Sequence, residues 1–527
     1  MFDDFLFITQ KKVEKLVRRY YECHFMTRDE VDIPFEGLLP DVHTSYLLSS
    51  LMNLPVSYES LDASGPWLVF WILHSLELLA VKISEDLSSK VISYLKSCQS
   101  KSGGFGGGPD QLPHLAPTYA AVAALCILKK NEAFEIIDRE NLCKFFAKCF
   151  QSDGSFTMHD GGETDIRGVY CALSVCRLLN LKFKSEKITS IDRWISECQT
   201  YEGGFGATPS CEAHGGYTFC GLASYSMLYD LKNANGENFQ KKSFPNIDLP
   251  KLMKWVSYKQ MSFEGGFQGR TNKLVDACYS FWQGAVFPLL YSLNRKLDSS
   301  IANFTFDTNA LEQYILICCQ KPTGGFIDKP GKNRDLYHTA YALSGLSITK
   351  GEMTKNSNDS DDEDFIPLKL TDPVINITPE AIENAVSLKM SHLAASDVKD
   401  PYENELFRKL TGPNDVGDDP SVVHHYLKLW HDFKNAQGRK FENFDDEKKR
   451  FLIFVDNYHK IQHHNLQYKL GLSTFTMAVN QFADKEPHEI CCGGLKPRDT
   501  EKKCCGKIYT VLTPKRENAG YDPFILE

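Results

Sequence analysis

The sequence contains no apolar run long enough to cross a membrane, which needs roughly 18 consecutive apolar residues. Its N-terminus has neither the basic residues nor the small-residue cleavage site of a secretory signal. Positive charge is not in excess either: the net charge is −9, and nucleic-acid-binding surfaces normally carry a basic stripe. We therefore expect a cytoplasmic protein that has no membrane span and binds no nucleic acid.

The sequence also lacks the signs of a disulfide framework. Its 17 cysteines are scattered through apolar, helix-like segments, and no secretory signal precedes them. Reduced thiols that occupy small core positions explain most of them. The pairs Cys491-Cys492 and Cys504-Cys505 leave a weak metal or disulfide signal open.

One phrase recurs along the chain: a glutamine, a few polar residues and Gly-Gly-Phe. It occurs at 99–105, 199–205, 260–267 and 320–326, with a degenerate copy at 151–156. A spacing of roughly 50–60 residues predicts a repeat architecture. The glycines permit a tight turn with positive φ, and the phenylalanine can anchor that turn on the core.

Each phrase is followed by a helix-like segment rich in small residues. These segments are led by Tyr119, Tyr170, Tyr217, Tyr279 and Tyr337. Small residues allow close packing on both sides, so we expect an inner ring of helices, which the apolar segment 67–79 would join. Amphipathic segments before the phrases, such as 87–98 and 188–198, predict an outer ring. The fold class is therefore all-α, an α/α barrel (toroid) of repeated helical hairpins, with an open solenoid as the alternative.

Reactive residues gather near the leading tyrosines. Arg167, His214 and Asp276 each lie three residues before one, Cys278 lies one before, and His338 lies one after. In a ring these side chains would meet at one rim. Asp276, Cys278 and His338 could bind Zn²⁺ and leave a fourth position open, as in catalytic sites. A helix cap, a buried thiol and a core histidine are the alternative interpretation.

A basic, polar stretch surrounds Asp276. Arg270, Lys273, Tyr279 and His214 could together hold a diphosphate, because Arg offers a forked donor set and Lys a point charge. A solvated helix start is the alternative interpretation. Aromatic residues on the predicted inner helices would line a cavity for a long apolar ligand with one charged end. These are Trp67, Tyr119, Tyr170, Trp282 and Tyr341.

Six ordered motifs resemble the β subunit of protein farnesyltransferase, over about residues 10–395. They are PWLVFWILHSLELL (66–79), HLAPTY (114–119), EAHGGYTFCG (212–221), FEGGFQGR (263–270), NKLVDACYSFWQ (272–283) and DKPGKNRDLYHTAY (328–341). The resemblance implies an α/α barrel and a heterodimer with a separate α subunit, which supplies a further diphosphate-binding lysine. It also implies transfer of a farnesyl group from farnesyl diphosphate to the cysteine of a C-terminal C-a-a-X (CaaX) sequence.

The resemblance assigns roles to individual positions. Asp276, Cys278 and His338 match the zinc ligands, with one ion per β subunit. Arg270, Lys273, His214 and Tyr279 match the diphosphate contacts, and Tyr279 also joins the catalytic set. Asp328 matches a position associated with Mg²⁺. We assign the isoprenoid and peptide pocket to Trp67, His114, Tyr119, Arg167, Tyr170, Cys220, Trp282, Tyr337 and Tyr341.

The donor is expected to be farnesyl diphosphate, because bulky Trp67 and Tyr341 would stop a longer tail. Geranylgeranyl-transferring relatives carry a smaller residue at the tryptophan position. A geranylgeranyltransferase type I β subunit remains the alternative enzyme, and a non-catalytic scaffold or protease inhibitor is the alternative of another class. Terpene cyclases use consecutive aspartates, which the predicted inner segments lack.

A second resemblance lies near the C-terminus. Two motifs resemble the inhibitory propeptide of papain-type cysteine proteases over about residues 421–490: Asp446-x3-Arg450-x2-Ile453-Phe454-x2-Asn457-x3-Ile461-x3-Asn465 and Ala478-x-Asn480-x-Phe482-x-Asp484. Asp446 and Ala478 depart from the usual Glu and Gly. The resemblance makes a papain-like protease a candidate partner. The 37 residues that follow residue 490 are too few for a protease domain.

We therefore predict a barrel at 1–395, a linker at 396–420, a small, mainly helical propeptide-like domain at 421–490 and a cysteine-containing tail at 491–527. The acidic stretch 356–364 predicts a disordered loop. The propeptide-like segment could be a standalone inhibitor, a vestige or an erroneous joining of neighbouring genes.

Overall fold

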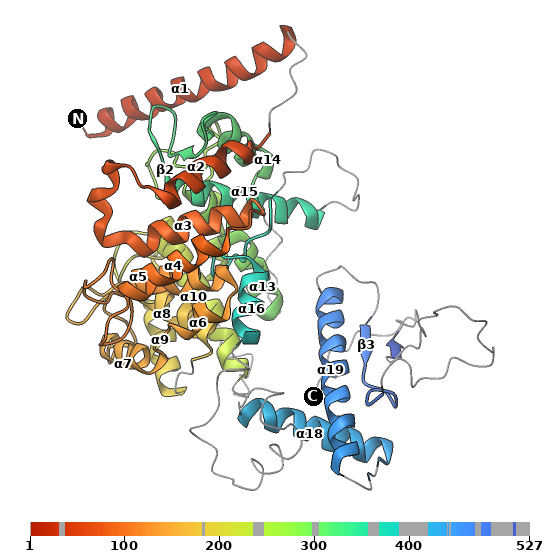
Figure 1. Cartoon of the computed structure of the whole chain (residues 1–527). Helices are drawn as coiled ribbons and strands as arrows, with labels where there is room; N and C mark the ends of the chain where they lie inside the picture. Colours follow the sequence, from red (N-terminus) through yellow and green to blue (C-terminus); the bar gives the residue numbers. More distant parts are fainter. Residues whose placement is uncertain are drawn as a thin grey trace. The chain divides into compact units, whose positions relative to one another are not determined.

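The computed structural model in Figure 1 describes residues 2–30, 37–181, 185–234, 247–297, 305–356, 368–388, 420–439, 441, 444–469, 476–485 and 510–512. The chain forms two compact units, Met1–Val386 and Ser387–Glu527. The predicted boundary at residue 395 and nearly all of the linker and acidic loop lie outside the described residues, as do Cys491, Cys492, Cys504 and Cys505. None of the described helices is long and apolar enough to span a membrane.

The first unit is built from inner and outer helices. The inner helices are α3 (Gly65–Leu78), α5 (Leu115–Leu128), α8 (Ile166–Leu179), α10 (Gly215–Ala234), α12 (Tyr279–Trp282), α13 (Val286–Leu297) and α15 (Leu336–Asn356). The outer helices are α2 (Pro40–Met52), α4 (Glu85–Cys98), α7 (Arg139–Cys149), α9 (Ser185–Glu197), α11 (Leu249–Ser257) and α14 (Thr308–Gln313), which runs into the π-helical turn η3 (Tyr314–Cys319).

Smaller elements complete this unit. They are α1 (Phe2–Glu30), the 3₁₀ segment η1 (Val56–Ser64), α6 (Asn131–Glu135), β1 (Phe326–Ile327), β2 (Arg334–Asp335) and α16 (Pro379–Leu388). α1 packs against η3, and η1 leads into α3. β1 and β2 pair antiparallel, with Phe326 opposite Asp335.

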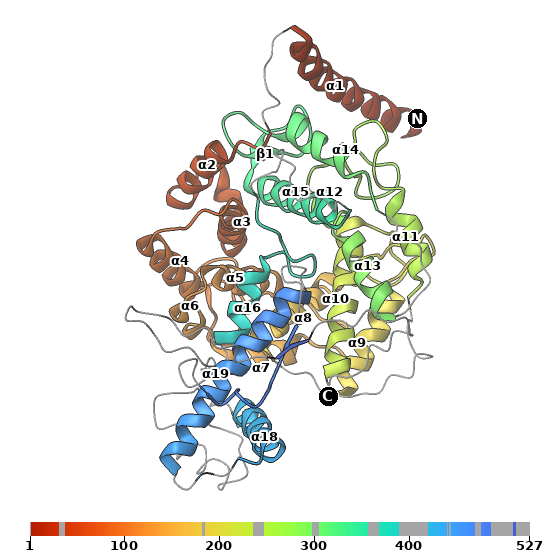
Figure 2. The same cartoon turned by 90° about the vertical axis from the view of Figure 1, so that its right-hand side faces the viewer.

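The inner helices form a closed ring. α3 packs on α5, α5 on α8, α8 on α10, α10 on both α12 and α13, α12 on α15, and α15 returns to α3. Figure 2 shows this ring with the outer helices around it. The return of α15 to α3 confirms the α/α barrel and excludes the open solenoid.

Residue size explains which helices lie inside. Ala120, Ala121 and Ala123 on α5 are fully buried, and this helix is apolar on every side, as expected for a helix with neighbours all around it. α4 instead buries one stripe that includes Val91 and Leu95, while its Lys90 stays exposed. A helix with one apolar stripe suits the outer layer, because the stripe faces the core and the polar side faces solvent.

The recurrent glutamines join each repeat to the next. Gln199 Oε1 accepts a hydrogen bond from Asp248 N at 2.7 Å, and Gln199 Nε2 donates to Asp248 O at 3.0 Å. Asp248 is the N-cap of α11, so the turn of one repeat holds the start of the next outer helix. Gln99 and Gln260 accept from Asp138 N and Asp307 N in the same way.

Glycine is required where the turn meets that helix. Gly203 has φ +111°, and a Cβ on it would lie 2.2 Å from the Lys251 carbonyl oxygen. Both the backbone conformation and the contact exclude a side chain. Gly324, with φ +86°, is in the same position against Val42 O of α2.

The same hydrogen bond, from the N-cap of an outer helix to a repeat glutamine, closes the ring between the last and first repeats. Gln320 Oε1 accepts from Leu39 N, the N-cap of α2, at 2.9 Å. Fully buried His43 accepts from Gly325 N through Nδ1, so its Nε2–H donates to Gln320 Oε1 at 2.8 Å. The Gln320 side chain thus satisfies two donors at the start of α2, which are 281 and 277 positions away from it in the sequence.

Gln320→Ala is expected to lower the unfolding free energy by about 2 kcal/mol, because it leaves the buried His43 Nε2–H and Leu39 N–H without an acceptor. Denaturant unfolding measures this loss. Gln151→Ala is the matched control, since the Gln151 side chain bonds to nearby Cys149 O and should lose little. Equal stability of the Gln320→Ala protein and the wild type would contradict the closing role.

The helix expected from Tyr279 is interrupted. α12 ends at Trp282, and the backbone resumes helical form only at α13. Gln283 N and Gly284 N both point to Tyr279 O, at 2.9 and 3.4 Å, so the turn is widened there. A Cβ on Gly284 would lie 2.2 Å from Ser280 O, so only glycine fits this bend.

A turn at residues 371–377 lies across the inner helices. Its carbonyls accept from two inner-helix tyrosines: Tyr119 Oη donates to Ile375 O at 2.6 Å and Tyr170 Oη to Val374 O at 3.1 Å. Asp372 Oδ1 accepts from Val374 N and Ile375 N at 2.9 and 2.8 Å and so shapes the turn. The phenol groups that line the barrel are therefore tied to this turn.

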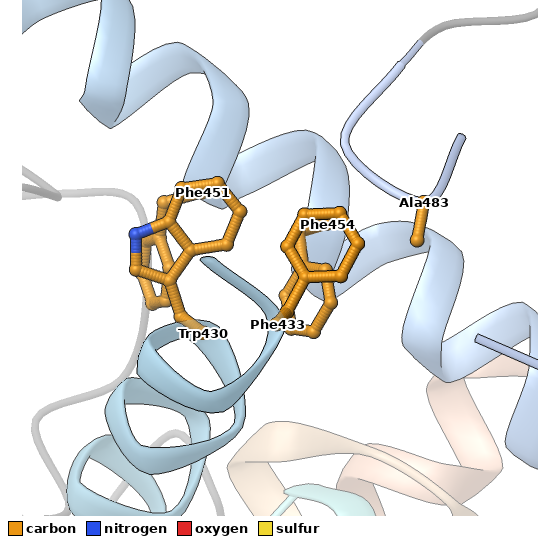
Figure 3. Packing of buried hydrophobic residues seen from close by; sticks show 5 residues of the cluster. All are labelled: Trp430, Phe433, Phe451, Phe454 and Ala483. Carbon is orange, nitrogen blue, oxygen red and sulfur yellow. The ribbon is translucent and has the colours of Figure 1, made fainter. Parts of the chain in front are cut away.

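The second unit contains α18 (Pro420–Gln437), α19 (Phe444–Lys469) and the antiparallel strands β3 (Thr476–Ala478) and β4 (Thr510–Leu512). α18 and α19 confirm the helices expected in the propeptide-like segment. Their core is a cluster of Trp430, Phe433, Phe451, Phe454 and Ala483, shown in Figure 3.

Polar side chains of α19 hold the segment that follows it. Asn465 donates to Met477 O and accepts from Met477 N, at 2.7 and 2.6 Å. Asn457 Nδ2 donates to Ala483 O at 3.0 Å, and Arg450 donates to Asp484 O at 3.2 Å. The two sequence motifs of this segment therefore pack against each other.

Candidate metal centre and adjoining cavity

Asp276, Cys278 and His338 converge although 60 residues separate the last two. Cys278 is the N-cap of α12, Asp276 lies two residues before it, and His338 is in the first turn of α15. α12 packs against α15, which brings the three side chains together. One ligand atom from each lies within 4.8 Å of the others, with His338 Nε2 3.3 Å from Asp276 Oδ1.

Asp335 orients the histidine of this cluster. Its Oδ2 lies 2.6 Å from His338 Nδ1, and its Oδ1 accepts from His338 N at 2.7 Å. With Nδ1–H held by a carboxylate, Nε2 faces Asp276 and is the ring atom available to a metal. A carboxylate behind a histidine ligand is typical of zinc sites.

The charges of the cluster act on one another. Burial alone would lower the pKa of His338, but its bonds to Asp276 and Asp335 raise that pKa to about 9. Burial alone would raise the pKa of Asp276, but its interactions with His338 and Cys278 lower that pKa to about 2. Burial and the Asp276 charge raise the pKa of the Cys278 thiol well above its usual range. Metal binding would therefore displace protons from both His338 and Cys278.

These three residues fit a zinc ion. They offer oxygen, sulfur and nitrogen, a donor set that zinc accepts, and three protein ligands leave one position for a substrate. Cys278 is 3% exposed, while Asp276 and His338 retain 24% and 16% exposure, so the cluster stays open on the carboxylate and imidazole side.

Asp335→Asn is expected to weaken zinc binding by about 10–100-fold, because an amide holds the His338 ring less strongly than a carboxylate. The variant keeps an oxygen to cap the first turn of α15, so the fold should be retained. Competition with a chromogenic chelator measures the affinity. A zinc affinity equal to that of the wild type would rule out this positioning role.

The predicted diphosphate residues surround the cluster. His214 Nε2 lies 3.0 Å from Tyr279 Oη, and its Nδ1 accepts from Gly216 N, so Nε2 carries the proton. Burial, with the charge of Arg270, lowers the pKa of His214 and keeps the ring neutral. Arg270 forms an ion pair with Glu212. Lys273 is exposed on the same loop, three residues after Arg270.

The backbone of Asp328 lies beside the metal cluster. Its carbonyl oxygen accepts from Ala277 N at 2.9 Å. Its carboxylate forms an ion pair with buried Lys329, and burial followed by the Asp276 charge raises its pKa. The carboxylate is thus already paired with a cation.

An aromatic cavity of about 350 Å³ opens next to the cluster. Its lining is Ser64, Trp67, Trp71, Ala116, Tyr119, Arg167, Tyr170, Cys171, Cys220, Trp282, Tyr337 and Tyr341. Tyr337 links it to the metal cluster, because it also hydrogen-bonds with Cys278. This volume lies within the usual range of ligand pockets, about 300–1,000 Å³.

The aromatic rings of the cavity contact one another in a continuous chain, in which Trp71 joins Trp67 to Tyr337. The ring centroids of Trp67 and Tyr119 lie 5.6 Å apart, and those of Tyr119 and Tyr170 lie 5.4 Å apart. Trp282 and Tyr341 lie 4.5 Å apart, and Trp282 Nε1 donates to Tyr337 Oη at 3.0 Å. Because Tyr119, Tyr170 and Trp282 use their polar atoms in hydrogen bonds, the faces of their rings are left for an apolar ligand.

The lining differs from the predicted pocket at a few positions. His114 caps α5 and lies 5.7 Å from His159 rather than lining the cavity. Four residues line it that were not expected: Ser64, Trp71, Ala116 and Cys171. A signal for Trp71 existed, since it follows Trp67 by one helical turn and so shares its face.

Arg167 is the charged group of the lining. The Asp165 carboxylate accepts three hydrogen bonds from it, at 3.0, 3.2 and 2.6 Å, and this contact raises the pKa of the guanidinium. The guanidinium also lies 5.9 Å from the ring of Tyr217. It is thus fixed in place before any ligand binds.

Fold and site define an α/α-toroid protein with a three-residue candidate metal set beside an aromatic cavity. Residues 38–377 match the family model for the prenyltransferase alpha-alpha toroid domain, and the chain belongs to this family. Its relatives identify it further as a protein prenyltransferase of the β-subunit type.

The β subunit of protein farnesyltransferase from Arabidopsis thaliana is 38% identical over 383 residues, covering 62% of this chain and 75% of that one. The β subunit of geranylgeranyl transferase type-1 from the same plant is 33% identical over 339 residues, covering 60% of this chain and 86% of that one. A solved structure of Candida albicans protein geranylgeranyltransferase-I, complexed with GGPP, has a TM-score of 0.55 at 24% identity and covers 67% of this chain and 100% of that one, which supports the fold.

The second unit has its own match. Residues 430–490 match the cathepsin propeptide inhibitor domain (I29). This finding confirms the resemblance seen in the two C-terminal motifs.

Proposed function

We propose that this chain is the catalytic β subunit of a protein farnesyltransferase, which transfers the farnesyl group of farnesyl diphosphate to the cysteine of a CaaX sequence. The observation that carries the proposal is the convergence of Asp276, Cys278 and His338 beside an aromatic cavity. One end of the cavity suits an apolar tail and the other a metal-bound thiol.

The metal would act on the acceptor cysteine. A cysteine with an ordinary pKa near 8.5 is mostly protonated at neutral pH, and zinc held by Asp276, Cys278 and His338 would supply the charge that keeps its sulfur as a thiolate. The nucleophile belongs to the substrate, so no covalent bond to this chain is expected. The sulfur forms a bond to C1 of the farnesyl group while the bond from C1 to the diphosphate oxygen breaks.

The leaving diphosphate needs positive charge and hydrogen-bond donors. Arg270 and Lys273 supply charge, while neutral His214 and Tyr279 can donate hydrogen bonds. Groups placed before the reaction stabilise the charge that develops on the leaving oxygens. Asp328 would hold Mg²⁺ near the diphosphate, which requires it to exchange its ion pair with Lys329.

Donor choice follows from the shape of the cavity. Trp67 and Tyr341 both line the cavity, and their bulk would exclude a longer tail. The alternative, geranylgeranyl transfer, is favoured by one relative that carries this activity in its name. A competition between the two diphosphates decides between them.

The enzyme is proposed to work as a heterodimer. Its β-type relatives are named as subunits, and we infer that a separate α subunit completes the diphosphate site. A cytoplasmic location agrees with the reduced thiols of buried cysteines such as Cys98, Cys149 and Cys198. We propose no function for the propeptide-like unit, and no contact among its described residues supports a protease partner.

The test is coexpression with an α subunit from a related farnesyltransferase. We expect one zinc per heterodimer and thioether formation on a CaaX peptide, with farnesyl diphosphate preferred. A heterodimer that binds both substrates without zinc and without product would identify a non-catalytic scaffold. Preference for the longer diphosphate would identify a geranylgeranyltransferase.

A further inference from the structure

Lys259 is a lysine buried beneath the loop that carries the basic side chains of the diphosphate site. It is 4% exposed, and among the described residues no aspartate or glutamate forms an ion pair with it. Its ammonium group lies 4.6 Å from the centroid of the Trp255 ring and donates to Thr271 Oγ1 at 3.0 Å. Lysines are rarely buried without a charged partner, so this arrangement needs an explanation.

The partner of Lys259 lies between Arg270 and Lys273. Thr271 follows Arg270 directly, and Asn272 has φ +59°. Lys273 N donates to Arg270 O at 3.3 Å, which makes residues 270–273 a tight turn. The threonine hydroxyl is therefore attached to the same few backbone atoms that place both basic side chains.

The base of this loop is held by bonds that do not involve the Lys259 side chain. Gln283 Nε2 donates to Gln268 O at 2.7 Å, Gly215 N donates to Gly269 O at 2.7 Å, and Gln268 pairs with Val275 across the loop.

The tip of the loop has weaker ties. Lys273 N donates to Gln268 Oε1 at 3.2 Å, which is a contact within the loop itself. Arg270 pairs with Glu212, and both of these side chains are exposed. The bond from Lys259 to Thr271 therefore joins the tip to a buried part of the barrel.

We propose that Lys259 is a positioning residue for the diphosphate-binding loop, acting through the Thr271 hydroxyl to hold Arg270 and Lys273 in place. The buried ammonium reaches the tip of the loop from beneath. Its contact with the face of the Trp255 ring fixes the position of the ammonium group, so the hydrogen bond to Thr271 comes from a donor that is held in place. This inference rests on the proposed diphosphate site.

Burial lowers the pKa of Lys259, while the charges of Glu202 and Glu212 act in the opposite direction. The Lys259 side chain donates to Thr271 Oγ1, and in the ammonium form this bond is charge-assisted. A charge-assisted bond of this kind is stronger than one between neutral groups.

The experiment measures the Kd of farnesyl diphosphate for the heterodimer by isothermal titration calorimetry. Lys259→Met and Thr271→Val should each raise this Kd about tenfold, and the double variant should bind no more weakly than either alone, because both remove one contact. Lys259→Arg, which keeps a charged donor, should stay within about threefold of the wild type. The KM of the CaaX peptide should not change.

Thr271→Val decides the role. The Thr271 side chain is exposed, so the substitution should not affect folding. The substitution also leaves the Lys259 charge in place. A higher Kd in Lys259→Met alone would overturn the inference, because the effect would then come from lost charge or packing. An unchanged Kd in both variants would overturn it too.

Arg270→Ala separates this inference from the proposed function. If Arg270→Ala binds farnesyl diphosphate as tightly as the wild type, the proposed diphosphate site itself is wrong. If Arg270→Ala weakens binding while Thr271→Val does not, the site stands and only the role of Lys259 fails.

Discussion

Cys278→Ala is expected to abolish zinc binding and to reduce kcat/KM for farnesyl transfer about a thousandfold or more. Cys278 supplies the sulfur of the three-residue set and lies at the contact between α12 and α15. Without it, only an aspartate and a histidine remain, and they already pair with each other at 3.3 Å. Loss of metal stabilisation worth about 4 kcal/mol corresponds to this factor.

The zinc content of the purified heterodimer and single-turnover rates on a CaaX peptide measure both effects. Cys98→Ala is the matched control, because Cys98 is a buried thiol of outer helix α4 and should keep zinc and activity. Full activity of the Cys278→Ala protein with no bound metal would exclude the proposed mechanism.

Trp67→Thr combined with Tyr341→Phe is expected to shift the ratio of kcat/KM toward geranylgeranyl diphosphate by at least about tenfold. Trp67 lines the cavity and packs against Tyr119 at 5.6 Å, so a threonine there opens space along the wall. Tyr341 lies 4.5 Å from Trp282, and losing its hydroxyl frees further volume. An added isoprene unit would fill this space with apolar contacts.

Competition between the two diphosphates on one peptide gives the ratio directly. Tyr201→Thr serves as the control, because Tyr201 is 91% exposed and does not line the cavity. If the double substitution left the ratio unchanged, these two side chains would not set donor length.

The metal cluster was predictable because repeats place equivalent positions at one rim. Cys278 and His338 flank the leading tyrosines of two repeats, and the closed ring brings those repeats together. Asp335 was not recognised as the orienting carboxylate, since its effect depends on the 2.6 Å contact with His338 Nδ1. The site roles assigned from the resemblance remain predictions.

Other features needed the three-dimensional arrangement. His114 falls outside the cavity because it caps α5 and turns toward His159. The bend after Trp282 depends on the contact of Gly284 with Ser280 O, which no periodicity reveals. The turn at 371–377 joins the barrel by bonds between segments about 200 or more residues apart.

The amino-acid sequence by itself determined the all-α repeat fold, the inner and outer helices and the meeting of Asp276, Cys278 and His338 at one rim, because helical periodicity, small residues and repeat position are local properties of a chain. Only the tertiary structure decided that the ring closes through Gln320 and Leu39, which atoms of Asp276, Cys278 and His338 face one another, and that Lys259 lies beneath the loop at residues 268–275. These depend on distances between segments far apart in the sequence, and such distances are set by packing rather than by any local pattern.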